Sequence, residues 1–152
     1  MKYSFVICVL LLLYSTTIFG QFLNEKDWST LSDYVKAKDN TSFESFIKQK
    51  NFIKSDESNE KYTFYQWKET KGIFYGIRVN NKSGQVTYMT NDQNYVLKLL
   101  SRFISDYSLV ESKKKGTLSV THVFDSQTST IAIKLDTATN SGTHLLFAVA
   151  KS

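Results

Sequence analysis

Apolar residues recur with two different periods along the chain, and these periods divide it into helices and strands. Three segments have apolar positions every three or four residues, as on one face of an amphipathic helix. Asn24 can cap the first, and Thr41-Ser42-Phe43-Glu44 has capping-box spacing at the start of the second. The apolar positions of these two helices are Trp28, Leu31, Tyr34, Val35, Phe43, Phe46 and Ile47. The third and longest stripe comprises Tyr95, Val96, Leu99, Leu100, Phe103, Ile104 and Tyr107.

Six further segments alternate between apolar and polar residues or are rich in β-branched and aromatic residues, which predicts strands. They cover residues 62–68, 73–79, 85–90, 117–124, 130–135 and 143–150. Gly84 ends a polar turn and can take the left-handed conformation there. The order is helix, helix, three strands, helix, three strands. It predicts an α+β domain of two layers, with the helices packed on one face of an antiparallel sheet.

The second half of the chain repeats the pattern of the first. An offset of 103 − 46 = 57 residues places Phe103-Ile104 on Phe46-Ile47, and one more residue places Ile131 and Ile133 on Ile73 and Tyr75. Residues 41–90 and 91–152 are either a duplicated helix–meander unit or two units with the same periodicity by chance. In element order alone, the chain resembles the duplicated folds of secreted β-lactamase inhibitor proteins and periplasmic domains of similar build. This resemblance implies no activity, since a fold does not specify a function.

Strand alternation predicts which side chains face the helices. Tyr65, Trp67 and the set Ile73, Tyr75, Ile77 and Val79 should face inward, as should Leu118, Val120, His122 and Phe124. In the last strand we expect Leu145, Phe147 and Val149 inside and His144 on the other face. Tyr62, Phe64, Phe74 and Arg78 then share the second face of the sheet. Aromatic side chains there predict a binding surface, or a surface covered by another layer, a terminal segment or a second copy of the chain.

Residues 1–20 have the layout of a secretory signal peptide. Lys2 is followed by an apolar run from Phe5 to Leu13, and Gly20 suits the position before a cleavage point. The run is short for a spanning helix, so we expect no stable membrane anchor. We therefore expect an exported protein, periplasmic or extracellular, whose residues 21–152 form a single domain.

Composition narrows the chemistry. The 152 residues are 41% hydrophobic and 22% charged, with a net charge of +5, no proline and one cysteine, Cys8. Cys8 lies in the signal segment, so no disulfide or cysteine-based zinc site is expected. His122 and His144 are far apart in the chain and give no metal-ligand spacing, and no glycine-rich phosphate loop exists, so no metal or cofactor is expected. Lys113-Lys114-Lys115 reads as a solvated loop, and an exported address argues against a nucleic-acid partner.

Two function classes remain. The first is a non-enzymatic binding or inhibitory module that uses the aromatic face and binds a protein or a small ligand. The alternative is a small envelope enzyme centred on His122 with Asp125. The glycosylation triplets at Asn40 and Asn81 do not separate them.

Overall fold

The structure, a computed structural model, describes residues 23–67, 72–116, 119–136 and 142–150. The helices are α2 (Glu25–Lys36), α3 (Asn40–Gln49) and α4 (Gln93–Asp106). The strands are β1 (Ile53–Lys54), β2 (Tyr62–Trp67), β3 (Tyr75–Asn80), β4 (Val86–Thr90), β5 (Ser108–Lys115), β6 (Ser119–Asp125), β7 (Ser129–Asp136) and β8 (His144–Ala150). The predicted α+β fold with an antiparallel sheet is confirmed. The predicted signal segment 1–20 and Leu118 lie outside the described residues.

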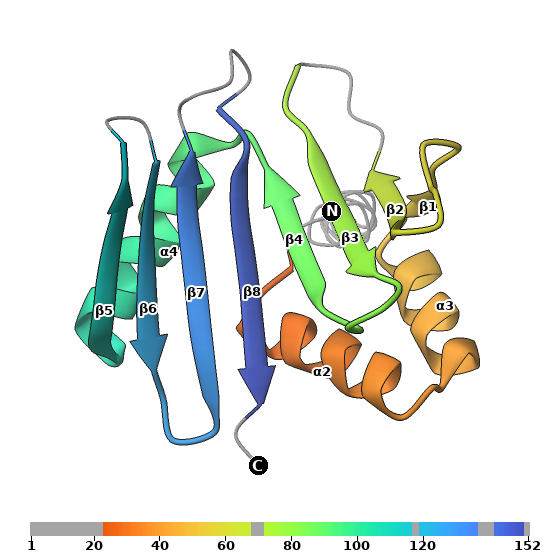
Figure 1. Ribbon diagram of the computed structural model, residues 1–152, viewed down its shortest axis with the longest axis horizontal. Helices are drawn as coiled ribbons and strands as arrows, with labels where there is room; N and C mark the ends of the chain where they lie inside the picture. The colour runs from red at the N-terminus through yellow and green to blue at the C-terminus, as the bar shows by residue number, and fades with distance from the viewer. Residues whose placement is uncertain (1–22, 68–71, 117–118, 137–141, 151–152) are drawn as a thin grey trace, which may run out of the picture.

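All the strands form one 8-stranded antiparallel sheet in the order β1-β2-β3-β4-β8-β7-β6-β5 (Figure 1). It consists of two meanders, β1 to β4 and β5 to β8, which join where β4 pairs with β8. At this joint Tyr88 lies opposite Leu146 and Met89 lies opposite Leu145. The last strand of each meander is therefore central, and β1 and β5 are the outer strands.

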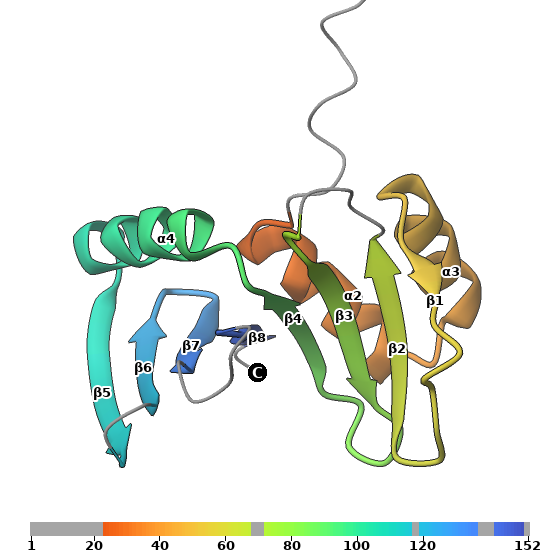
Figure 2. The same cartoon turned by 90° about the horizontal axis from the view of Figure 1, so that it is seen from above.

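Helices α2, α3 and α4 lie on one side of the sheet (Figure 2). Helix α2 lies against the joint between the meanders. The Ser32 hydroxyl donates to the Ala148 carbonyl of β8 at 3.3 Å. The Trp28 ring packs against Tyr88 of β4, with 6.1 Å between ring centroids. One helix thus contacts both halves of the sheet.

Helix α3 contacts the first meander, whereas α4 contacts both. Tyr95 of α4 lies 6.2 Å from Tyr75 of β3 and 6.1 Å from Tyr88 of β4, between ring centroids. Phe43 of α3 lies 5.5 Å from Tyr65 of β2, and Phe103 of α4 lies 5.8 Å from Phe124 of β6, between ring centroids. The apolar strand side chains buried on this face are Tyr65, Tyr75, Ile77, Val79, Val86, Tyr88, Phe124, Ile131, Ile133, Leu146 and Ala148. We refer to it as the helix face and to the opposite side as the open face.

The helix caps follow the sequence at α2 and differ at α3. Asn24 and Asp27 form a capping box in which each side chain accepts the other's backbone N–H at 3.0 Å, so the predicted cap is confirmed. Helix α3 begins two residues earlier than predicted. Its cap is Asp39, whose carboxylate accepts the N–H of Ser42 at 3.0 Å. This hydrogen bond lowers the pKa of Asp39. The predicted capping box at Thr41 was therefore wrong.

The apolar stripe of α4 is narrower than predicted. Phe103 is completely buried, but Leu100 is only partly buried and Ile104 is 65% exposed. Only one strip of a helix can touch a flat sheet, and α4 lies near the outer strand β5, where no further element of the described chain covers its flank. Helical periodicity therefore could not show how much of the stripe is covered.

Strand β5 was missed. Lys113-Lys114-Lys115, predicted as a solvated loop, forms the end of this outer strand, which pairs with β6 except at a bulge between Leu109 and Glu111. All of its side chains are exposed, so neither alternation nor hydrophobicity indicates a strand there. The two-residue strand β1 was missed for the same reason. Ile73, predicted as a core strand residue, precedes β3 and is 37% exposed.

The predicted orientation of β8 was wrong. His144 is buried on the helix face together with Leu146 and Ala148, while Leu145 and Phe147 lie half-buried on the open face. Both alternating sets of this central strand are apolar, so the pattern cannot separate them. Burial lowers the pKa of His144, and its buried Nδ1 atom has no hydrogen-bond partner among the residues that the structure describes.

Candidate functional site

Three of the four predicted binding residues come together on the open face. Phe64 of β2 pairs directly with Arg78 of β3. The Tyr62 ring lies 6.0 Å from the Phe64 ring, and the Arg78 guanidinium lies 4.9 Å from the centroid of Tyr62. The Lys61 ammonium approaches the same ring at 5.1 Å. We call Tyr62, Phe64 and Arg78, with Phe74 described below, the aromatic patch.

The alternation of β2 produces this arrangement. Tyr65, between two open-face positions, is buried on the helix face and donates its hydroxyl hydrogen to the Glu44 carboxylate at 2.7 Å. Burial and this acceptor raise the pKa of Tyr65. Because side chains alternate, anchoring Tyr65 to α3 turns Phe64 to the other side.

Phe74 lies on the same face as the other three residues, but not as part of the predicted strand. It precedes β3, and its backbone N–H donates to the Asn91 side chain at 2.6 Å. Its ring lies over Gly76: a Cβ atom at Gly76 would be 2.7 Å from Cζ of Phe74 and 3.3 Å from Cε of Met89. Gly76 thus leaves the space in which the ring rests on the sheet.

The sequence did not indicate how far this apolar surface extends. Met89 of β4 pairs with Leu145 of β8, and Phe147 of β8 pairs with Ala132 of β7, all on the open face. This extent was missed because the sequence analysis assigned Leu145 and Phe147 of β8 to the helix face. The internal repeat contained a usable signal: an offset of 146 − 88 = 58 places Leu146 on Tyr88, a helix-face position.

The patch carries positive charge. Arg78 and Lys61 stack on Tyr62, and neither forms a salt bridge within the described ranges. Cations near aromatic faces form partly desolvated sites that favour negatively charged partners. All three aromatic residues of the patch are half-buried, so their rings remain accessible.

The structure does not bring His122 and Asp125 together. They are three residues apart on β6, which places them on opposite faces of the sheet. The Nδ1 atom of His122 lies 2.9 Å from the Ser112 hydroxyl, whereas the Asp125 carboxylate accepts a hydrogen bond from Thr130 at 2.8 Å. Asp125 therefore does not orient this serine–histidine pair as the third group of a triad would.

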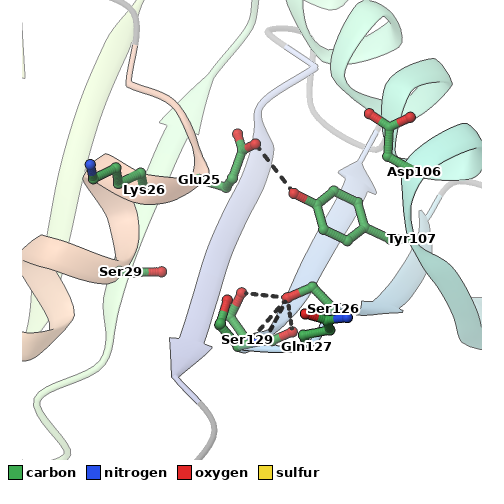
Figure 3. Close-up of a pocket in the computed structure, with 9 residues that line it drawn as sticks. Glu25, Lys26, Ser29, Asp106, Tyr107, Ser126, Gln127 and Ser129 are labelled. Carbon is green, nitrogen blue, oxygen red and sulfur yellow. Dashed lines mark hydrogen bonds between the residues drawn. The ribbon is translucent and has the colours of Figure 1, made fainter.

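A polar pocket of about 500 Å³ lies between the start of α2, the end of α4 and the β6–β7 turn (Figure 3). Its lining residues are Glu25, Lys26, Ser29, Asp106, Tyr107, Ser126, Gln127, Thr128 and Ser129. Glu25 accepts from the Tyr107 hydroxyl at 3.4 Å and from Arg102, and Ser126 and Ser129 bond one another. Burial raises the pKa of Tyr107. Many of its polar groups therefore already have partners within the chain.

Within the described residues, no cluster of three or more histidine, cysteine, aspartate or glutamate side chains could hold a metal ion. No helix in that part of the chain has the length and apolar character needed to cross a membrane. No family model, curated protein or solved structure matches this chain.

Proposed function

We propose that this chain is an exported, non-enzymatic binding or inhibitory module whose aromatic patch contacts a protein partner. The observation that carries the proposal is the cluster of Tyr62, Phe64 and Arg78, half-buried on a sheet face that no described helix covers. Aromatic residues and arginine are the residue types that contribute most energy at protein interfaces.

The chemistry of the patch indicates what the partner presents. Arg78 and Lys61 favour a carboxylate, and the Phe64 and Phe74 rings on the same face favour an apolar side chain. Leu145 and Phe147 extend the apolar area across the joint between the meanders. We therefore propose a partner segment that combines acidic and apolar side chains.

We also propose that the two meanders derive from one duplicated helix–meander unit. The offset of 58 residues relates Leu146 to Tyr88, and these two residues pair with each other at the joint. A pseudo-two-fold axis between them would relate one meander to the other, as in a symmetric pair of identical units. On this proposal the open face has two related halves, one aromatic and one mainly aliphatic.

Site-specific photocrosslinking in cells that produce the protein tests the function. A photoreactive phenylalanine analogue at position 64 should give one discrete adduct, and Arg78→Glu should abolish it. The same analogue at Val123, on the open face of β6, is the matched control. No adduct at position 64, or equal adducts at both positions, would contradict the proposal.

A further inference from the structure

The outer strand β5 is an exposed edge with its own apolar border. Four of the seven large hydrophobic side chains that are exposed in the described ranges lie on α4 and β5: Leu97, Ile104, Leu109 and Val110. Lysines and a β-bulge, both of which β5 has, commonly protect a strand edge, but monomeric proteins rarely cluster exposed apolar residues beside such an edge. We infer that β5 pairs with β5 of a second copy of this chain, which makes the protein a symmetric dimer.

The exposed residues of α4 lie on the side that such a dimer would cover. Arg102 contacts Glu25 of α2, so that flank of α4 faces the middle of the molecule. Leu97 and Ile104 project from the opposite flank, because they lie on the far side of the buried positions of the helix. Figure 2 shows α4 on the helix side at the end of the molecule that carries β5.

The alternation of β5 restricts how two copies can pair. Glu111 pairs with Val123 on the open face, Ser112 with His122 on the helix face, and Lys113 with Thr121 on the open face. In an antiparallel pair, directly opposite side chains point to the same face. A two-fold axis perpendicular to the sheet must therefore run midway between the two copies of one residue, so that this residue lies opposite its own copy. We call this an axis through that residue.

The charges along β5 favour one position of the two-fold axis over the others. An axis through Glu111 would oppose two glutamates, and an axis through Lys113, Lys114 or Lys115 would oppose two lysines. Like charges directly opposite one another destabilise a strand pair. An axis through Ser112 instead places Glu111 of each copy opposite Lys113 of the other copy, which gives two pairs of opposite charge. These two side chains already lie 2.8 Å apart within one copy, so the dimer would contain a cluster of four alternating charges.

The same axis brings the apolar residues together. Both copies of α4 would lie on the same side of a continuous sheet, with Leu97, Ile104 and Leu109 of each copy near the junction. Such a contact combines an edge-to-edge ladder, complementary charges and apolar burial. It leaves the aromatic patch on β2 and β3 uncovered, so it is independent of the proposed function.

Charge reversal tests the pairing. Sedimentation over a concentration series should show a dimer for the purified protein, and Glu111→Lys or Lys113→Glu alone should weaken it roughly tenfold or more. The double variant Glu111→Lys with Lys113→Glu restores opposite charges and should restore the dimer. Glu60→Lys and Lys82→Glu make the same charge changes at exposed sites away from β5 and should have no effect. A wild-type monomer throughout, or a dimer that both single reversals leave intact, would overturn the proposal.

A disulfide test checks the register without changing charge. With Cys8→Ser as background, Ser112→Cys should form an intermolecular disulfide, because opposite Cα atoms are about 4.5–5.5 Å apart and a disulfide spans about 4.4–6.8 Å. Lys114→Cys faces the same side, but the two copies of residue 114 would be about 14 Å apart and should not crosslink. Crosslinking of residue 114 without residue 112 would overturn the register.

Discussion

Tyr88 of β4 lies directly opposite Leu146 of β8, and both side chains are buried on the helix face. This pair lies at the joint between the two meanders, below Trp28 of α2. The packing of the two halves into one sheet therefore depends on residues that are 58 positions apart in the sequence.

The joint provides a direct test of the corrected orientation of β8. Leu146→Ala should lower the free energy of unfolding by about 2–5 kcal/mol, because it leaves a cavity beneath α2. Leu145→Ala, one residue away on the open face, should cost about 1 kcal/mol, since Leu145 is only half-buried. Denaturant melts of the two variants measure the difference. A larger loss for Leu145→Ala would restore the orientation expected from the sequence.

The aromatic patch should contribute to binding more than to stability. Phe64→Ala combined with Phe74→Ala should abolish the photocrosslinked adduct from a reporter at position 62 and lower stability by about 1 kcal/mol. Phe43→Ala is the buried control and should cost about 3–5 kcal/mol, because Phe43 is 5% exposed on the helix face. A stability loss of the double variant as large as that of the control would mean that the patch is a covered structural surface.

Gly76 should matter through Phe74 and not through its own backbone. Gly76→Ala should destabilise the protein, because the new Cβ would lie 2.7 Å from the Phe74 ring. With Phe74→Ala as background, the same change should be neutral or stabilise by about 0.5–1 kcal/mol, since alanine suits a strand better than glycine. A double-mutant cycle measured by denaturant melts gives the coupling. Additive effects would show that the two residues do not interact.

His144 should make stability depend on pH. In the unfolded chain the imidazole titrates near 6.5, whereas burial lowers its pKa in the folded protein and Asp136 opposes this only in part. Below about pH 6.5 the unfolded state therefore binds more protons than the folded state. Stability should be greatest above this pH and fall as pH drops towards the folded pKa, by at most about 1.4 kcal/mol per pH unit.

The comparison with His144→Asn isolates this contribution. The variant has no titrating group at the position, so its stability should fall less steeply than that of the wild type between pH 7 and 5, about where an imidazole titrates. Melts at pH 8, where both forms are neutral at residue 144, give the packing difference alone. If the stability of the two proteins fell equally with pH, His144 would not be the group responsible.

The layout of residues 1–20 predicts cleavage on export, and therefore the mass of protein recovered outside the cytoplasm. Cleavage after Gly20 should leave a chain that begins at Gln21. Intact-mass spectrometry of protein recovered outside the cytoplasm measures this directly. A recovered mass that includes residues 1–20 would show that the segment is retained.

The sequence by itself determined the features for which the local pattern of residues allows only one structure. The helix cap at Asn24, the turn at Gly84, and the alternation that turns Phe64 and Arg78 to one face all follow from local geometry. Each depends on residues that are close in the chain, where spacing fixes the direction of a side chain. The α+β class followed from the order of these elements.

Only the tertiary structure decided the rest, because it depends on which segments meet. Strand β5 has no apolar face and forms only because β6 supplies its hydrogen-bond partners. The orientation of β8 depends on its pairing with β4, since both of its faces are apolar. The wider open-face surface and the exposed border of α4 follow from that topology. Pairing between distant segments, and the surface that it leaves uncovered, is not contained in local periodicity.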